Sequence, residues 1–437
     1  MRRPTAVVLV LSLAAALAAC GESSKLPLAQ GVGPAPELPP PVRVPIPTVH
    51  VAEASGWPAG ATPVAAAGLK VQPFATGLEH PRWLLALPNG DVLVAETAAP
   101  PQPEQYQDKG LKAAFMKMFM KKAGSAVPSA NRITLLRDGD GDGVAEVNRP
   151  YITGLSSPFG MALVGSTLYV ANADALVAFP YDPAASTIAA APRTIARLPA
   201  ERNHHWTKSL AAGPDGKLYV GVGSNSNVAE HGMAEEEGRA AVWQIDPATG
   251  ATRLYATGLR NPVGLDFRPG TAELYAVVNE RDELGSDLVP DYLTRVQDGA
   301  FYGWPWSYYG AHVDSRVEPP RPDMVARAIA PDYALGSHVA PLGLAFADGA
   351  RLLGPSYAGG VFIGQHGSWN RNPFSGYKVV FIPFAAGSPS GQPVDVLTGF
   401  LTGAKAMGRP VGVEIARDGA LLVADDVGNT VWRVSAL

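Results

Sequence analysis

The sequence predicts an all-β fold, a six-bladed β-propeller, because one hairpin-like pattern recurs six times along the chain. The clearest copy spans 258–280, where Arg260, Asn261 and Pro262 precede an alternating apolar run, a Pro-Gly turn and a second apolar run. Two such runs joined by a glycine-containing turn are typical of a β-hairpin. The other copies begin near positions 77, 154, 204, 338 and 408. One hairpin repeated with irregular insertions indicates blades around a central axis.

The residues just before each inner strand should meet at one mouth of the central channel. When the copies are aligned on their turns, these positions hold His80, Ser157, Trp206, Asn261, Ala340 and Arg409. One position earlier they hold Glu79, Ser156, His205, Arg260, Val339 and Gly408. Each residue taken alone could be a solvated loop residue. Their recurrence at one repeat position favours a site.

Within this ring, His205 and its neighbours suit acid–base chemistry. A histidine at the end of a rigid strand can act as a general base, since its pKa lies near working pH. Arg260 and Asn261 on the next blade would place a cation and an amide beside it, able to polarise an oxygen and stabilise negative charge. The sequence contains no phosphate-binding glycine motif, nucleophile elbow or zinc-binding pattern.

The first twenty residues are expected to be an export signal rather than part of the fold. Two arginines precede a short apolar run, and the segment ends Leu-Ala-Ala-Cys at Cys20. This ending resembles the lipobox of bacterial lipoproteins, so we expect a lipid anchor at Cys20 on the periplasmic side of a membrane. Cys20 is the only cysteine, which excludes internal disulfides. A proline- and alanine-rich stretch, 21–67, is expected to be an extended tether, and 68–437 the propeller domain.

Composition and charge give no indication of a nucleic-acid partner. The formal net charge is −4, and the sequence shows no basic field of the kind that phosphate backbones require. One insertion is strongly basic, the stretch 109–124 between the first two copies, whose pattern predicts an amphipathic helix. We expect it to pack on the domain or to cover the channel mouth. A membrane surface is the alternative.

Two acidic loops are candidate calcium sites. In the first, Asp138, Asp140 and Asp142 alternate with glycines, so their carboxylates could converge on one hard cation. The twelfth position is Arg149 rather than glutamate, so the loop is either a calcium loop of another type or a plain Asp-Gly turn series. The second loop, 279–292, contains Glu280, Asp282 and Asp287 and is followed by an aromatic cluster, 301–309. That cluster could contact a planar ligand or belong to the core.

Several segments together resemble the soluble pyrroloquinoline quinone (PQQ)-dependent sugar dehydrogenases. They read GLRNPVGLDF, NERDELGSDLVPDY, FYGWPWSYYG, GQHGSWNR, HHW with GPDGKLYVGVGSNSN, and GRPVGVEIARDGALLVADDVGNTVWRV. The chain is most similar to the sorbosone and aldose dehydrogenase branch, from about Leu69 to Val434. The resemblance implies a six-bladed propeller.

The resemblance also implies residue roles. His205 matches the family's catalytic base, which removes a hydroxyl proton while hydride passes to the quinone. Arg260 matches the arginine that polarises the quinone carbonyl, and Asn261 matches its neighbour on the cofactor. Arg409 corresponds to an arginine that binds the cofactor's carboxylates.

Other positions depart from the family pattern. The region of Arg281 and Asp282 matches the backbone that presents carbonyls to calcium. Ser224 stands where glucose-oxidising members have an aspartate beside the histidine. The family's cofactor lysine falls within 365–371, so Arg371 or His366 would substitute for it. These changes leave the glucose preference open.

The sequence therefore predicts PQQ- and calcium-dependent oxidation of an aldose, or of a small sorbosone-like aldehyde, to the lactone or acid. Electrons would pass to a periplasmic or membrane acceptor. One alternative is a calcium-dependent propeller lactonase, whose metal would be bound directly by carboxylate and amide side chains at the same mouth. The other is a non-catalytic, sugar-binding propeller lipoprotein.

Overall fold

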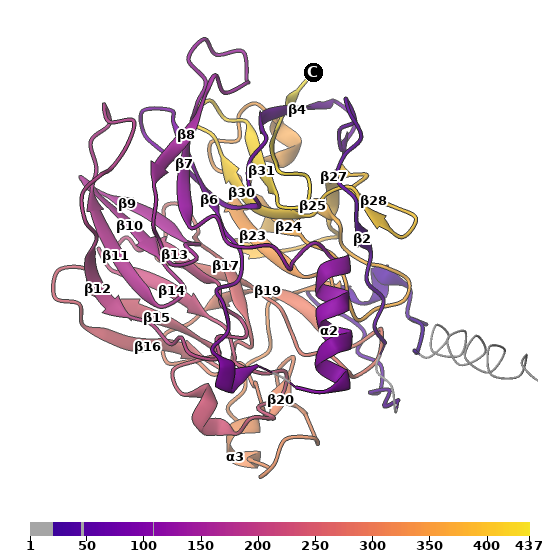
Figure 1. The fold of residues 1–437 in the computed structure, drawn as a ribbon. Helices are drawn as coiled ribbons and strands as arrows, with labels where there is room; N and C mark the ends of the chain where they lie inside the picture. Colours follow the sequence, from indigo (N-terminus) through magenta and orange to yellow (C-terminus); the bar gives the residue numbers. More distant parts are fainter. Residues whose placement is uncertain (1–20, 45–47, 108) are drawn as a thin grey trace, which may run out of the picture.

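The computed structural model describes residues 21–44, 48–107 and 109–437. Within them, six sheets have four or more strands. Five shorter strands lie apart from these sheets or beside one edge, namely β2 (Glu53–Ala54), β20 (Ser307–Tyr308), β21 (His312–Val313), β28 (Leu401–Thr402) and β29 (Lys405–Ala406). A further two-residue strand, β26 (Ser388–Pro389), pairs with β25. The fold is nearly all-β and propeller-like (Figure 1).

The first three large sheets each contain four consecutive strands. The first sheet comprises β5 (Pro81–Ala86), β6 (Val92–Glu96), β7 (Arg132–Arg137) and β8 (Val147–Ile152). The second comprises β9 (Met161–Val164), β10 (Thr167–Ala171), β11 (Ala175–Pro180) and β12 (Arg193–Arg197). The third comprises β13 (Lys208–Ala212), β14 (Leu218–Val222), β15 (Ala241–Ile245) and β16 (Thr252–Thr257).

The other three sheets each recruit a strand from the N-terminal part of the chain. The fourth contains β17 (Pro262–Phe267), β18 (Leu274–Val278), β19 (Pro290–Val296), β22 (Tyr333–Ser337) and β1 (Val32–Gly33). The fifth contains β23 (Pro341–Phe346), β24 (Gly360–Gln365), β25 (Lys378–Ala385), β27 (Val394–Thr398) and β3 (Val64–Ala65). The sixth contains β30 (Pro410–Ile415), β31 (Leu421–Asp425), β32 (Thr430–Ala436) and β4 (Leu69–Thr76).

Helices are short and peripheral. The α-helices are α2 (Leu111–Lys122) and α3 (Pro322–Val325). The 3-10 helices are η1 (Leu28–Gln30), η2 (Glu104–Tyr106), η3 (Met233–Glu236) and η4 (Pro355–Tyr357). No helix in the described ranges is long and apolar enough to cross a bilayer.

Each predicted hairpin forms the first two strands of one large sheet. The antiparallel pairs are β5–β6, β9–β10, β13–β14, β17–β18, β23–β24 and β30–β31, which confirms the repeat pattern. The first strand of each sheet contacts the first strand of the next, and β30 contacts β5, so these strands form a closed ring. The sixth sheet joins the two ends of the fold, because β4 pairs antiparallel with β32.

Proline and glycine shape these inner strands. Proline is the first residue of β5, β17, β23 and β30, where a missing N–H costs little, and the register shifts soon afterwards. Glycine follows where neighbouring strands approach closely. A Cβ at Gly343 would lie 2.1 Å from the Val411 carbonyl oxygen, and one at Gly412 would lie 2.8 Å from the Arg82 carbonyl oxygen. Only glycine permits this spacing.

The stretch 21–67 is not the free tether that its composition predicts. Strands β1 and β3 extend two of the large sheets, and β2 pairs in parallel with β29. Asp287 accepts hydrogen bonds from the Ser24 hydroxyl at 2.5 Å and the Lys25 amide at 2.6 Å. The prolines therefore favour an extended chain that lies along the sheets. The predicted signal segment and Cys20 lie outside the described residues.

Candidate active site

The predicted mouth residues line one cavity of about 450 Å³. Six of the twelve aligned positions contribute to its wall, namely His80, His205, Trp206, Arg260, Asn261 and Ala340. Three of these aligned positions have a positive φ, namely 56° at His80 and 52° at Ala340, each directly before its inner strand, and 44° at Ser157, four residues before β9. Residues with side chains rarely adopt this conformation. Half of the copies therefore share a backbone conformation at this position that residue types alone do not reveal.

His205 is held in one orientation three residues before β13. Its Nδ1 lies 2.8 Å from the Ser224 carbonyl oxygen and 3.1 Å from the Ser224 hydroxyl. A carbonyl only accepts hydrogen bonds, so Nδ1 carries the proton and Nε2 has a free lone pair. Burial, the Arg260 charge and His204 lower the pKa of His205 well below its ordinary value. The side chain is therefore a neutral base with a fixed tautomer.

Arg260 joins two loops beside this base. Its side chain is 4% exposed. It donates to the Glu280 carbonyl at 2.7 Å and to the Asn227 side-chain oxygen at 3.1 Å, and it lies 3.4 Å from Asp282. Asn261, the next residue, has a buried Oδ1 with no hydrogen-bond partner in the described chain. That oxygen lies against Gly223, so in this arrangement it is buried and unpaired.

The second acidic loop contributes a carboxylate cluster to the same wall. Asp282 lies 3.3 Å from His338 Nδ1, and His338 Nε2 lies 3.0 Å from the Gly285 carbonyl. Burial opposes charge on both groups, but their contact raises the pKa of His338 and, with Arg260, lowers the pKa of Asp282. This geometry favours an imidazolium beside a carboxylate.

Glu280 and Asp291 belong to the same loop, but their pKa values are raised, whereas that of Asp282 is lowered. Asp291 accepts hydrogen bonds from the Glu280 and Ala340 amides, both at 2.8 Å. Burial raises the pKa of Glu280 to about 8 and that of Asp291 to about 6. Glu280 Oε1 is buried and has no partner within the described residues. The cavity thus holds acceptor oxygens that a cation would stabilise in charged form.

Arg82 and Asp426, which the sequence did not single out, join His80 and His366 in another part of the wall. Arg82, His80 and His366 surround the buried carboxylate of Asp426. His366 Nε2 lies 2.9 Å from Asp426 Oδ2. Burial lowers the pKa of His366 to about 4, and although burial opposes charge on Asp426, these neighbours hold its pKa below the ordinary range. This wall therefore holds the Arg82 cation, which Asp426 already pairs, and two histidines whose lowered pKa values favour the neutral form.

Aromatic and apolar side chains form the remaining surface. Trp206, Trp369 and Leu342 line the cavity, and Met116 and Met120 of α2 lie at its edge. The predicted aromatic cluster does not line it. Tyr302 is fully buried, and Trp304 donates to the Asn227 carbonyl at 2.9 Å. The cluster is core.

Several predicted site residues do not line the cavity. Ser224 is fully buried and positions His205. Arg409 is also fully buried, with its guanidinium 4.9 Å from the centre of the Tyr377 ring. Arg281 forms a 2.8 Å ion pair with buried Asp314, and Arg371 donates to the Ser24 hydroxyl at 2.7 Å. In this arrangement the roles expected of Arg409, Arg371 and Arg281 at the ligand would be indirect.

Asp287 and the first acidic loop lie elsewhere. Asp287 binds the N-terminal stretch through Ser24 and its neighbours rather than facing the cavity. In the loop between β7 and β8, ligand atoms of Asp138, Asp140, Asp142 and Glu146 lie within 4.8 Å of one another. Two glycine amides donate to Asp138, at 2.7 and 2.9 Å. Calcium binding there stays a prediction.

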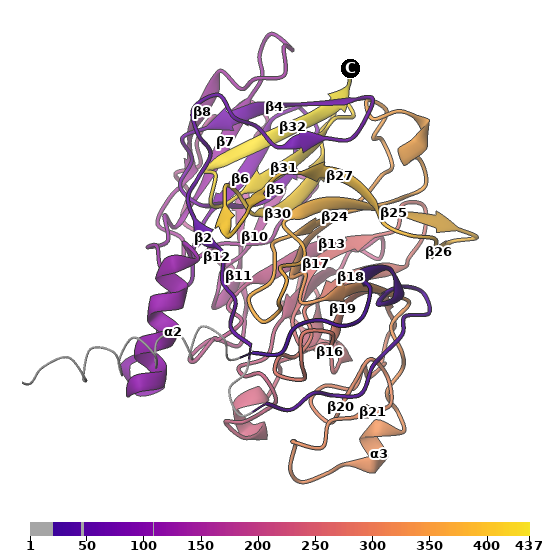
Figure 2. The ribbon, with the colours of Figure 1, turned by 90° about the vertical axis from the view of Figure 1, so that its right-hand side faces the viewer.

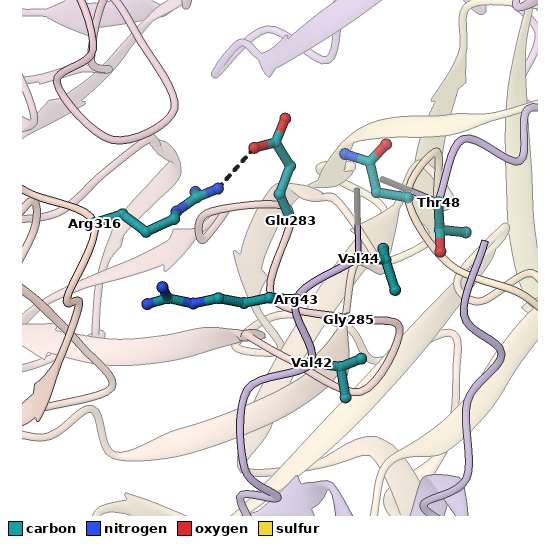
Figure 3. Close-up of a pocket in the computed structure, with 8 residues that line it drawn as sticks. Val42, Arg43, Val44, Thr48, Glu283, Gly285 and Arg316 are labelled. Carbon is teal, nitrogen blue, oxygen red and sulfur yellow. Dashed lines mark hydrogen bonds and ion pairs between the residues drawn. The ribbon is translucent and has the colours of Figure 1, made fainter. Parts of the chain in front are cut away.

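A smaller cavity of about 320 Å³ is lined by Glu283 and Gly285 of the second acidic loop (Figure 3). Arg43 and Arg316 lie side by side in it, and Arg316 donates to Glu283 at 2.9 Å. Asn370 lines both cavities. The smaller cavity contains none of the residues predicted from the sequence to act in catalysis.

The large cavity fits a flat, anionic quinone with a divalent cation. Tryptophan side chains provide flat walls, and the arginine and histidine side chains would face the anionic groups of such a ligand. Buried polar atoms without a partner in the described chain include Asn261 Oδ1, Glu280 Oε1, Asp426 Oδ1 and Arg82 Nε. Such atoms are costly unless a ligand or water satisfies them.

Comparison with known proteins places the chain in a family. A family model described as TrAA12-like matches residues 129–292 and 323–436. The chain belongs to the TrAA12-like family. The matched ranges contain His205 and Arg260 of the cavity wall, together with most strands of the fourth to sixth sheets.

Solved structures resemble this TrAA12-like protein in fold. The holo PQQ domain of pyranose dehydrogenase from Coprinopsis cinerea has a TM-score of 0.67 at 21% identity, covering 88% of this chain and all of that one. A calcium structure of a Trichoderma reesei enzyme of Carbohydrate-Active Enzymes Family AA12 has a TM-score of 0.69 at 19% identity, covering 89% and 99%. These identities establish similarity of fold.

The TrAA12-like chain spans about half the length of the curated relatives it matches. It is 33% identical over 221 residues to an uncharacterized protein of Borreliella burgdorferi, covering 50% of this chain and 57% of that protein. It is 23% identical over 335 residues to a PQQ-dependent pyranose dehydrogenase of Coprinopsis cinerea, covering 62% and 45%.

Proposed function

We propose that this TrAA12-like protein is a six-bladed propeller enzyme that uses PQQ to oxidise an aldose, or a small sorbosone-like aldehyde, to the lactone or acid. The observation that carries the proposal is His205, whose Nδ1 is held by Ser224 and which lines a cavity together with arginine, carboxylate and aromatic side chains. The six large sheets would be the six blades. The names of the relatives support the same class of reaction.

His205 would act as the general base. Its Nε2 takes the proton from the hydroxyl of the aldose, or of the hydrated form of the aldehyde, as the carbon–hydrogen bond on the hydroxyl-bearing carbon breaks. The Ser224 carbonyl holds the Nδ1 proton and stabilises the imidazolium that forms, while the nearby Arg260 charge disfavours that imidazolium. The proton can therefore leave again before the next turnover.

The cofactors would occupy the polar walls of the same cavity. Arg82 and His366 face anionic groups on one side, and Arg260 and Asn261 lie on the other. The 280–282 stretch offers carbonyl and carboxylate oxygens to calcium. When bound, the quinone supplies the oxidising group that accepts hydride, and calcium makes that group more electrophilic.

Reconstitution tests this proposal. The chain from Gly21 to Leu437, purified from a host that makes no PQQ, is mixed with PQQ with and without calcium. Reduction of an artificial dye is then followed with aldoses and small aldehydes, sorbosone among them. We expect reduction only with both additions, and saturable quenching of protein fluorescence by PQQ. If PQQ neither binds nor supports turnover, the proposal is wrong.

A calcium-dependent lactonase is the second candidate. One observation favours it, because Glu280, Asp282 and Asp291 place carboxylates in the cavity next to the amides of Asn261 and Asn279. Such side chains could bind calcium directly. Lactone hydrolysis that needs calcium but no PQQ would select this function. Sugar binding without turnover would instead indicate the non-catalytic propeller.

The location of the enzyme is a separate proposal. The lipobox-like ending at Cys20 supports lipid attachment on the periplasmic side of a membrane, with electrons passing to an acceptor there. Mass spectrometry of the mature N-terminal peptide tests it. An unmodified Cys20, or a retained signal segment, would contradict it.

A further inference from the structure

Helix α2 has apolar side chains on two faces, and both faces are partly exposed, with Met116 41% and Met120 37% exposed. Met116 and Met120, four positions apart, line the edge of the large cavity. Phe115 and Met118 lie on another face and are 46% and 54% exposed. In Figure 2 the helix stands at one side of the molecule, away from the sheets. The outer face therefore leaves apolar area in solvent, where a partner would be favoured.

The charge of this segment narrows the kind of partner. Residues 109–122 contain five lysines and no acidic residue, although the whole chain has a net charge of −4. Lys117, Lys121 and Lys122 are exposed beside the outer face. Apolar side chains with a lysine margin suit the interface of an anionic lipid bilayer, where methyl groups enter the acyl region and ammonium groups stay at the headgroups.

The helix lies on the same face of the molecule as the start of the described chain. The Glu22 side chain accepts from the Ser286 amide at 2.8 Å, and Ser24 bonds to Asp287. Both partners belong to the loop that also carries Asp282 to the cavity wall. The twenty residues that precede Gly21 include an apolar run. Helix α2 and the start of the described chain thus both lie next to elements of the cavity wall.

We propose that α2 docks on an anionic lipid bilayer, with Phe115 and Met118 inserted at the interface and Lys117, Lys121 and Lys122 at the headgroups. The cavity then opens beside the membrane surface. Met116 and Met120 form the contact between the docked helix and the cavity mouth, so substrate enters along the membrane. This docking depends on neither the proposed reaction nor a lipid on Cys20.

Vesicle binding tests the proposal directly. The chain from Gly21 to Leu437, which contains every element described above, is sedimented with vesicles of phosphatidylglycerol and phosphatidylcholine, or of phosphatidylcholine alone. We expect binding to the anionic vesicles, little binding to the neutral ones, and release at about 1 M salt, where charges are screened. Equal binding to both, or to neither, would overturn the proposal.

Matched variants separate the two contributions. Replacing Lys117, Lys121 and Lys122 by glutamine should weaken binding about a hundredfold, since each lysine near an anionic surface strengthens it roughly fivefold. The control replaces Lys70 and Lys405, which are exposed elsewhere, and should change little. Phe115→Ser with Met118→Ser should weaken binding about tenfold or more, whereas Leu254→Ser with Val394→Ser should not.

A spectroscopic readout distinguishes insertion from charge attraction alone. Fluorescence from a Met118→Trp variant should shift to the blue when anionic vesicles are added, beyond the signal of the native tryptophans. Thermal melting of every variant in solution should match the parent, because these side chains contact little of the fold. An unshifted spectrum would contradict insertion. Capture of an acidic protein by α2 without any vesicle binding would assign the face to that partner instead.

Discussion

At the scale of single residues, the catalytic proposal depends on the protonation state of His205. Only the neutral imidazole can accept the substrate proton, and protonation at low pH removes that ability. Because burial and Arg260 lower the pKa of His205, the acid limb of the pH profile should lie well below 6.5. We expect kcat/KM of the reconstituted enzyme to change little between pH 8 and about 6.5. A fall centred at or above pH 6.5 would contradict this.

The spacing between His205 and Asn261 depends on the absence of a side chain at Gly223. A Cβ there would lie 2.3 Å from Asn261 Oδ1 and 2.5 Å from His205 Cβ. Gly223→Ala should therefore displace both side chains and lower kcat about tenfold to a hundredfold, as expected for a shift of about 1 Å in a catalytic group. The control is Gly139→Ala, where the nearest atom to an added Cβ is 3.5 Å away. Equal activity in the two variants would show that this packing does not matter.

At the scale of elements, Asp287 attaches the N-terminal stretch to the loop of the site. Burial opposes its charge, yet hydrogen bonds from Ser24, Lys25 and Leu26 hold the pKa of Asp287 below its ordinary value. A carboxylate whose pKa is lowered by folding stabilises the fold above its unfolded pKa, and that contribution is lost as the pH falls.

Asp287→Asn should therefore destabilise this attachment by about 1–3 kcal/mol at pH 7. Amide hydrogen exchange should speed up across 24–33, and the difference from the parent should shrink toward pH 3. Asp323→Asn, at an exposed surface pair, is the control and should leave that stretch unchanged. Unchanged protection in Asp287→Asn would show that β1 alone holds the segment.

The elements themselves follow closely from the sequence. Alternation, turn glycines and the Pro-first inner strands predicted all six hairpins, because these signals act between neighbours in the chain. The docking of 21–67 was not predictable. Its strands are two residues long and gain their hydrogen bonds from sheet edges far along the chain. The composition of 21–67 correctly predicted an extended backbone. It wrongly predicted that this backbone would be free of the sheets.

At the scale of the whole molecule, the channel has charged groups at its far end too. Glu414 and Asp266 line a separate cavity of about 380 Å³ there. Burial, together with Asp266, raises the pKa of Glu414 to about 8. A carboxyl whose pKa is raised by folding is protonated in the native state, so stability falls as the pH rises from the unfolded pKa toward 8.

Glu414→Gln removes that titration. The free energy of unfolding of the variant minus that of the parent should therefore rise by roughly 2 kcal/mol from pH 5 to pH 8. This figure is discounted because Glu414 keeps some exposure to solvent. Thermal melting at both pH values measures the change. Glu37→Gln, on the surface, should show no such trend. A difference that does not depend on pH would mean that Glu414 is already ionised in the folded protein.

The site was predictable only where the repeat itself brought residues together. Alignment of the copies identified His205, Arg260, Asn261 and His80, which share one cavity. Arg82, His338 and Asp426 were missed, since Arg82 lies inside a strand and the other two gain meaning only from partners on other sheets. In the sequence, the only sign of these three residues is a charged or titratable side chain next to the end of a predicted strand. Arg409 and Arg371, expected at the cofactor, do not line the cavity, because Arg409 packs on Tyr377 and Arg371 bonds to Ser24, contacts that no local sequence pattern predicts.

The most direct test of the account is turnover of an aldose deuterated at C1 by the PQQ- and calcium-loaded protein, compared with His205→Ala. The parent should reduce the dye more slowly with the deuterated sugar, because the C1–hydrogen bond breaks in the oxidation. His205→Ala should bind PQQ with unchanged affinity and lose about 10²–10⁴ in kcat, while His312→Ala, on the surface, keeps full activity. Full turnover by His205→Ala, or a product formed by hydrolysis without dye reduction, would contradict the proposed dehydrogenase.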